Sequence, residues 1–477
     1  MKKINVWNTY DLPMQEKCEE FADGYMQFLN NGKTERECVD QAVLMAEAAG
    51  FRELSEYIEE GRKPVPGDKI YCVWMNKSVV LFRIGTKPME EGMNILGAHI
   101  DSPRLDVKQN PLYENSGIGY LDTHYYGGIK KYLYVAQPLS LHGVVVKKDG
   151  TTIELAIGDD EDDPVFFISD LLIHLSADQM KKDAASVVEG ENLDLIIGSR
   201  PVIIDAESKA GSKDKEPSAD DAVKKALLQI LKEQYDIEED DFESAELEVV
   251  PAGKAREAGL DRSMILSYGH DDRVCAYPSL TAILDEEDPE RTSCCLLVDK
   301  EEIGSVGATG MRSRFFENAL AEILHLMGYE GDLALRRTLA NSCMLSSDVS
   351  AAYDPIYAAA FEKKNAAILG NGIVFNKFTG SRGKSGSNDS NAEYIAHLRG
   401  IFDDADVRTQ TAELGKVDVG GGGTIAYILA LYGMNVIDSG VAVLNMHAPY
   451  EAVSKADVYE AYRAYRAFLA QASLRNM

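Results

Sequence analysis

The chain has 477 residues, of which 45% are hydrophobic, so it is long enough for two domains that each bury a core. It carries 49 Lys and Arg against 78 Asp and Glu, a formal net charge of −29. An electrostatic field of this sign repels nucleic-acid phosphates and anionic lipid surfaces, so nucleic-acid binding and membrane-surface binding are excluded as leading functions.

The first residues and the cysteines indicate a cellular compartment. The start of the chain lacks the apolar core of a secretory signal, and no segment reaches the about 18 apolar residues of a membrane helix. Seven cysteines are an odd number without a C-x-x-C pair, which is typical of reduced thiols. The sequence therefore predicts a cytoplasmic protein without membrane contact.

The first part of the chain predicts helices followed by strands. Apolar residues recur at helical spacing over residues 14–60, where Thr34 and Glu37 match a capping box, so two helices are expected. Three apolar runs then predict strands, over residues 69–75, 78–84 and 93–100.

Residues 106–261 have a different pattern of predicted secondary structure, which indicates an inserted β-rich domain. Their β segments are short, and Asp149-Gly150 between two β-branched runs indicates a hairpin. A polar run over residues 206–218 predicts a mobile loop. A helix is expected over residues 222–235.

The remaining sequence returns to alternating strands and helices. Strands are predicted over residues 293–298 and 441–445, with a strand or turn over 343–349. Helices are predicted over residues 315–327, 388–398, 424–431 and from Lys455 onward. This alternation predicts an α/β domain made of residues 1–105 and 262–477, with a mixed, largely parallel sheet flanked by helices.

Polar, metal-capable side chains directly follow several of the apolar runs. Each alone has an ordinary explanation as a helix cap, a turn or a hydrogen-bonded core residue. Their recurrence favours a site at the carboxyl ends of the strands. Nitrogen and oxygen ligands without thiolate suit zinc, cobalt or manganese, and two ions can share one bridging acid at about 3.5–4 Å. The residues are His99, Asp101, Asp271, Asp272, Glu301, Glu302, Asp348 and His447.

Spacing suggests roles for some of these side chains. Asp101 lies two residues after His99 on an extended segment, so both face one way and Asp101 can accept the imidazole proton. Neighbouring Glu301 and Glu302 would point to opposite sides, so one can bind metal while the other takes a proton from the attacking water. Spacing alone leaves open which glutamate does which.

Five motifs in order, "AHIDSPRLD", "DDR", "DKEEIGS", "SSDVSAAYDP" and "MHAPYE", resemble the aspartyl aminopeptidase family of di-zinc exopeptidases, which is related to vacuolar aminopeptidase I. The likeness runs from about residue 15 to about residue 470. It implies a metal-dependent aminopeptidase that removes N-terminal residues from peptides through a hydroxide bridging two divalent ions, with zinc expected and cobalt or manganese possible.

The resemblance also implies a role for each site residue. His99, Asp271 and Asp348 would hold one ion or its bridge, and Glu302 and His447 would complete the other. Asp271 would be the bridge, Glu301 the general base and Asp101 the acid that orients His99. A cis peptide bond between Asp271 and Asp272 is expected from the wider fold group.

Assembly and substrate contacts are further implications of the resemblance. The family forms a tetrahedral homo-dodecamer built from dimers, with the β insert as the oligomerisation domain. His174 would complete the active site of a neighbouring subunit, although alone it would be interpreted as a partly buried helix residue. Lys377 and Lys384 are alternative cations for an acidic first residue of the substrate.

Two other functions remain as alternatives, one enzymatic and one not. The same metals could hydrolyse N-acylated small amides, or the fold could serve as a non-catalytic assembly protein. The glycine run over residues 418–424 matches neither G-x-G-x-x-G nor a P-loop. In the family the corresponding glycines lie beside the substrate pocket.

Overall fold

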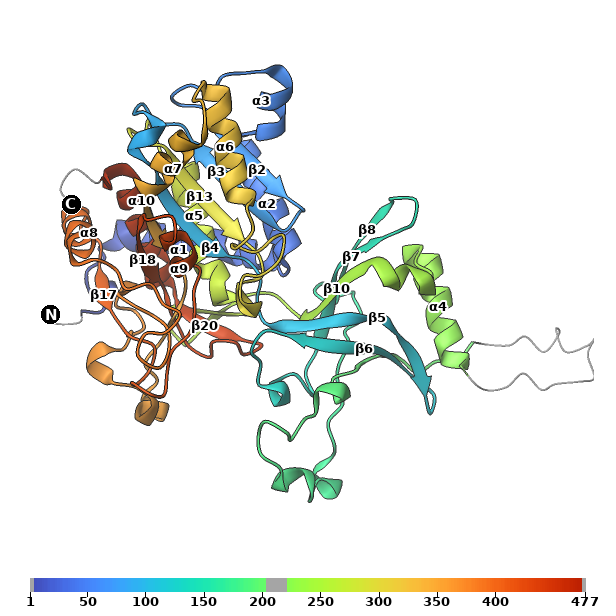
Figure 1. The fold of residues 1–477 in the computed structure, drawn as a ribbon. Helices are drawn as coiled ribbons and strands as arrows, with labels where there is room; N and C mark the ends of the chain where they lie inside the picture. The colour runs from blue at the N-terminus through green and yellow to red at the C-terminus, as the bar shows by residue number, and fades with distance from the viewer. Residues whose placement is uncertain (1–3, 203–220, 474–477) are drawn as a thin grey trace, which may run out of the picture. The chain divides into compact units, whose positions relative to one another are not determined.

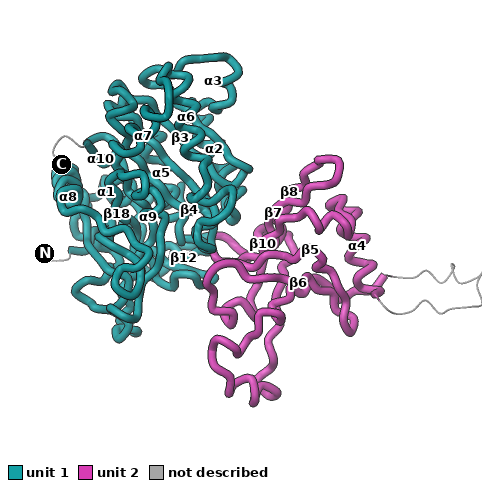
Figure 2. Tube along the Cα trace, in the orientation of Figure 1, with its two compact units in different colours: residues 1–102, 255–477 teal, residues 103–254 magenta. Residues whose placement is uncertain are grey.

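The computed structural model describes residues 4–202 and 221–473. The chain divides into two compact units, residues 1–102 with 255–477 and residues 103–254 (Figure 2). These boundaries lie a few residues upstream of the predicted ones. The predicted loop at residues 206–218 lies outside the described residues.

The first unit is built on a nine-stranded mixed sheet (Figure 1). Strands β13, β4, β14 and β18 run parallel in its centre, whereas β2–β3, β3–β13 and β16–β18 are antiparallel pairs. The predicted mixed, largely parallel sheet is confirmed. The strand order is β1 (Arg52–Glu53), β2 (Lys69–Trp74), β3 (Ser78–Arg83), β13 (Ser293–Val298), β4 (Asn94–His99), β14 (Cys343–Ser346), β18 (Asn435–Gly440), β16 (Ile373–Asn376) and β17 (Thr409–Thr411).

Two separate hydrophobic cores cover the two faces of this sheet. Alternate side chains of one strand enter different cores: Leu96 and Ala98 of β4 belong to one, and Ile95 to the other. This is the period of two expected for a strand buried on both sides. The first core contains α1 (Leu12–Asn31), α2 (Glu35–Ala48), α5 (His270–Leu284), α8 (Ala392–Asp404) and α10 (Lys455–Gln471); the second contains α3 (Leu54–Glu60), α6 (Phe315–Met327), α7 (Asp332–Ala340) and α9 (Ala426–Ala430).

Local signals in the sequence explain several helix positions. The capping box at α2 is confirmed, since Thr34 Oγ1 accepts the N–H of Glu37 and Glu37 accepts that of Thr34. At the start of α10, Lys455 is fully buried and its Nζ lies 2.5 Å from Glu19 and 2.6 Å from Glu257. Because a buried ammonium needs compensating charges, these pairs fix α10 against α1 and against β11 (Arg256–Ala258).

The second unit contains a six-stranded antiparallel sheet. Its order is β8 (Thr152–Ile157), β7 (Leu139–Val146), β10 (Ala245–Pro251), β5 (Arg104–Asn115), β6 (Ile118–Tyr126) and β9 (Leu195–Gly198). The predicted hairpin is β7–β8, with Gly150 in its loop at φ 89°. The helix predicted after the polar loop is α4 (Ala222–Tyr235).

The strand predicted over residues 441–445 is confirmed only for Ala442–Val443, and the main strand of this region was missed. The sheet strand is β18, and only Ala442–Val443 (β19) continues, pairing with β15 (Ser350–Ala351). Strand β18 does not form a continuous apolar run, because it contains the polar residue Asp438. The Asp438 carboxylate is nevertheless buried and accepts a hydrogen bond from Thr424. Gly440 is needed because a Cβ there would lie 1.9 Å from the carbonyl oxygen of Asp348.

Helix boundaries in the last third also differ from the prediction. Helix α8 begins at Ala392 and extends to Asp404, because Asn391 is its extended N-cap residue. Helix α9 is shorter than predicted and covers only Ala426–Ala430. Within residues 4–202 and 221–473, no helix has the length and apolar character needed to cross a bilayer.

Candidate metal and active site

Six of the eight predicted metal-capable residues line one cavity of about 410 Å³ in the first unit, and Asp101 and Asp272 lie outside its lining. His99 is the last residue of β4, and Glu301 and Glu302 follow β13 after Asp299 and Lys300. Because Val298 of β13 pairs with His99 in parallel register, both strands end at the same level. Asp271 lies in the first turn of α5, Asp348 follows β14, and His447 lies between β19 and β20 (Glu451–Ser454).

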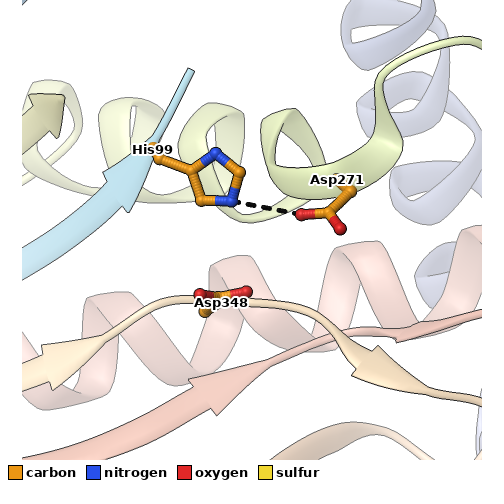
Figure 3. Close-up of side chains that lie close together, drawn as sticks. All are labelled: His99, Asp271 and Asp348. Carbon is orange, nitrogen blue, oxygen red and sulfur yellow. Dashed lines mark ion pairs between the residues drawn. The ribbon is translucent and has the colours of Figure 1, made fainter. Parts of the chain in front are cut away.

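Two groups of side chains in this cavity have ligand atoms within 4.8 Å of one another. The first is His99, Asp271 and Asp348; Figure 3 shows the imidazole directed at Asp271, with Asp348 on the facing loop. The second group is Asp271, Glu302 and His447.

Asp271 belongs to both groups and presents a different oxygen to each. Its Oδ1 lies 3.1 Å from His99 Nε2, and its Oδ2 lies 3.3 Å from His447 Nε2. Glu302 Oε1 lies 3.5 Å from the same His447 nitrogen. One carboxylate oxygen facing each group is the arrangement expected of an acid that bridges two cations.

The chemistry of these donors fits divalent cations. Asp271 Oδ1 and Glu302 Oε1 are buried and accept no hydrogen bond from the described residues. Buried carboxylates without compensation are costly, and a cation would remove that cost. Imidazole nitrogen with carboxylate oxygen is a donor set that suits zinc.

Burial and mutual repulsion perturb the acids of the cavity. Burial, with repulsion from Asp271, raises the pKa of Glu302 well above its ordinary value, and burial does the same for Asp348. The pKa of Glu301 is raised to about 7, mainly by burial. Burial would also raise the pKa of Asp271, but its two histidine neighbours outweigh it and lower that pKa. Crowded acids of this kind are typical of functional sites.

Asp101 contacts the site residues from outside the cavity. It is fully buried, and its carboxylate accepts the main-chain N–H groups of Glu301 and Glu302. His99 Nδ1 lies 3.0 Å from the Asp101 carbonyl oxygen and 3.4 Å from its carboxylate. The contact with His99 was expected from spacing, whereas the two main-chain contacts were not.

The local geometry of the two glutamates differs from the sequence expectation. Glu301 and Glu302 do not lie on an extended segment but begin a 3-10 turn, η9 (Glu301–Ile303). Lys300 before it has φ 68°, which turns the chain sharply out of β13. Both glutamates still line the cavity. Successive residues of such a turn diverge by about 120°, so the two side chains leave the main chain in different directions.

Two features that the resemblance implied are present. The peptide bond between Asp271 and Asp272 is cis. Gly421, Gly422 and Gly423 line the cavity beside the acids. A Cβ at Gly421 would lie 2.2 Å from the carbonyl oxygen of Gly380, so the main chains of these two glycines approach closely.

Two of the expected substrate-binding residues, Lys377 and Lys384, do not line this cavity, whereas His174 was expected to reach the site of a neighbouring subunit. Lys384 Nζ lies 2.9 Å from Asp389 and 3.8 Å above the centre of the Phe378 ring. His174 belongs to the second unit and is exposed on η4 (Ile173–Leu175), rather than partly buried in a helix.

One buried acid close to the ligands was not singled out from the sequence. Glu451, the last residue of the "MHAPYE" motif, accepts the main-chain N–H groups of Asp271 and His447. Its only signal in the sequence is its position at the start of a short apolar run.

Comparisons with known proteins identify the family of this chain. Residues 28–469 match the family described as "Aminopeptidase I zinc metalloprotease (M18)". A relative from Clostridium acetobutylicum, named "Probable M18 family aminopeptidase 1", is 55% identical over 465 residues, covering 98% of this chain and 97% of the relative.

Solved structures give the same result. The crystal structure of an M18-family aminopeptidase from Thermotoga maritima superposes with a TM-score of 0.91 at 43% identity, covering 99% of this chain and 100% of that one. The S. cerevisiae mApe1 dodecamer shares the fold, with a TM-score of 0.74 at 20% identity over 94% of this chain and 96% of that one. The chain belongs to the M18 family of zinc aminopeptidases.

Proposed function

We propose that this chain is a di-metal aminopeptidase that removes the first residue of peptides. The observation that carries the proposal is Asp271, whose two oxygens face two separate groups of potential ligands. His99 and Asp348 would hold one ion with Asp271, and Glu302 and His447 would hold the other. Two zinc ions bound there would polarise the scissile carbonyl and acidify water.

Glu301 is proposed as the general base. It lines the cavity but belongs to neither group of potential ligands. Its carboxylate would take a proton from the attacking water and donate it to the leaving amine. Asp101 would hold His99 in one tautomer through its Nδ1 side.

A free α-amino group distinguishes the aminopeptidase proposal from the deacylase alternative. The cavity contains the acids Asp271, Glu301, Glu302 and Asp348. Because Asp271, Glu302 and Asp348 would be neutralised by the bound ions, Glu301 is the carboxylate left to attract the ammonium group of a peptide, and an N-acylated substrate lacks that group. The complete set of ligands argues against a non-catalytic assembly protein.

There are two candidates for the chemical class of the first residue of the substrate, acidic and neutral. An acidic residue stays a prediction that rests on Lys377 and Lys384. Among the described residues that line the cavity, none is Lys or Arg, and Leu414, Met446 and Asn376 are uncharged. This lining favours a neutral first residue as the second candidate.

We also propose a homo-oligomer, a tetrahedral dodecamer built from dimers through residues 106–261, in which His174 enters a neighbouring active site. The yeast mApe1 structure is described as a dodecamer. Light scattering should then give about twelve times the 52.4 kDa of one chain. A cytoplasmic location stays a prediction from the sequence.

The proposed function is tested by metal reconstitution with a matched substrate panel. Apo protein would receive zero, one or two equivalents of zinc, cobalt or manganese, and Leu, Ala, Asp and Glu p-nitroanilides would be compared with their N-acetylated forms. We expect hydrolysis of the free-amine substrates only, with full activity at two equivalents. Preference for acetylated substrates would indicate the deacylase, and a folded protein that binds none of the metals would indicate the assembly protein.

A further inference from the structure

Glu451 connects the main chains of two residues that belong to the proposed metal site. Its Oε2 accepts the N–H of Asp271 at 2.9 Å, and its Oε1 accepts the N–H of His447 at 2.7 Å. Asp271 and His447 come from segments far apart in the sequence, the first turn of α5 and the loop before β20. A single carboxylate therefore joins two distant pieces of backbone.

The Glu451 side chain acts from outside the cavity. It is 2% exposed and is neither a lining residue nor a member of either ligand group. Its own main chain is held in a ladder, where it pairs with Ser267 of β12 (Met264–Ser267). The carboxylate is thus a fixed point to which the two main-chain N–H groups are attached.

Both partners of Glu451 need such a fixed point. His447 has φ 64°, a left-handed conformation that is unfavourable for a residue with a side chain unless its surroundings hold it. Asp271 departs from helical geometry within α5, at φ −81° and ψ 103°, and its carbonyl oxygen accepts a hydrogen bond from Ser102. Asp271 is therefore held on both sides, by Ser102 and Glu451.

We propose that Glu451 is a positioning residue that sets the separation of Asp271 and His447 and thereby the affinity of the site for metal. This inference rests on the proposed function, because that function assigns the two residues as ligands. Asp271 takes part in both groups, so a displacement of its main chain weakens both ion sites.

The chain offers a matched control in Asp457 of α10. This side chain is also fully buried, and it accepts two main-chain N–H groups, from Gly370 at 2.6 Å and from Gly372 at 2.7 Å. Neither glycine belongs to a ligand group. Replacing Asp457 by Asn therefore removes the same kind of interaction without touching a ligand.

The test compares Glu451→Gln with Asp457→Asn. Each amide keeps one acceptor and directs its NH2 group at a main-chain N–H, so both variants should have a lower Tm than the wild type. Only Glu451→Gln should bind zinc more weakly, by about 10–100-fold in competition with a fluorescent chelator. Asp457→Asn should keep the wild-type Kd for zinc and the wild-type kcat/KM.

A second variant keeps the proposal testable if Glu451→Gln does not fold. Glu451→Asp retains both oxygens but is one methylene shorter, so it should fold and still bind zinc more weakly, by less than Glu451→Gln. A wild-type Kd in whichever of the two variants folds, or an equal loss of affinity in Asp457→Asn, would overturn the role of Glu451. A wild type that binds no zinc would instead overturn the proposed function.

Discussion

The carboxylate of Asp101 accepts a hydrogen bond from the main-chain N–H of Glu301, whose nitrogen lies 3.1 Å from Asp101 Oδ1. The other oxygen accepts the N–H of Glu302 at 3.2 Å. Asp101 follows β4, which ends in His99, and the glutamates follow β13. One acid therefore sets the position of the proposed general base and of a proposed metal ligand relative to the imidazole.

Replacing Asp101 by Asn should weaken this arrangement. The amide accepts only one of the two N–H groups and directs its own NH2 at the other, so η9 and His99 should shift. We expect kcat/KM and zinc affinity to fall by about 10–100-fold, measured by steady-state kinetics and chelator competition. Asp403→Asn, on the exposed face of α8, is the control. Unchanged kinetics in Asp101→Asn would show that Asp101 is not needed.

The neighbouring glutamates should fail in different ways. Glu301→Gln should still bind two ions but lose turnover by about 10²–10⁴-fold, the usual contribution of a general base. Glu302→Gln should retain fewer ions per subunit, because an amide oxygen is a weaker ligand than a carboxylate. Elemental analysis with kinetics on both variants separates the roles. The reversed pattern would exchange them.

Gly440 should not tolerate a side chain. A Cβ there would lie 1.9 Å from the carbonyl oxygen of Asp348, so Gly440→Ala must displace β18 or Asp348. We expect a loss of about 2–4 kcal/mol in the free energy of unfolding, together with weaker zinc binding. A Cβ at Gly400 in α8 would enter open space, so Gly400→Ala should be stabilising by up to about 1 kcal/mol. Equal Tm values for both variants would contradict this prediction.

Glu286 should make stability depend on pH. Burial raises the pKa of Glu286 to about 7. The hydrogen bond from Ser293 lowers this pKa but offsets only part of the effect of burial. The pKa of Glu286 is higher in the folded protein than in the unfolded protein. Its contribution to the free energy of unfolding is therefore complete below about pH 4.5 and is lost as the pH rises towards 7.

Replacing Glu286 by Gln removes that titration. The Tm of the variant relative to the wild type should rise between pH 4.5 and 8, by the equivalent of up to about 3 kcal/mol. Thermal unfolding at several pH values measures it. A Tm difference that does not change with pH would show that Glu286 titrates normally in the folded protein.

The metal-capable residues could be predicted because they follow apolar strands, whose positions are encoded locally. Strand β18 could not, because buried Asp438 breaks its apolar pattern, and the hydrogen bond that Asp438 accepts from Thr424 depends on the folded structure. The turn at Glu301 was also missed, since left-handed Lys300 before it has no signature in the sequence.

Contacts between distant residues were the least predictable part of the site. Glu451 and Asp271 are 180 positions apart, so no periodicity relates them. The same holds for Asp101 and Glu301, 200 positions apart. Lys384 shows the converse problem, because its charge was evident but its pairing with Asp389 depends on how the loop folds.

The dispersal of the site along the chain has a consequence for biosynthesis. Residues 103–254 form one uninterrupted unit and can begin to fold while the ribosome is still translating the downstream residues. The sheet of the other unit forms later, because β4 lies between β13 and β14, and His447 and Glu451 are translated after all three strands. A chain that has been translated only as far as β14 consequently lacks His447, which belongs to the second group of potential ligands.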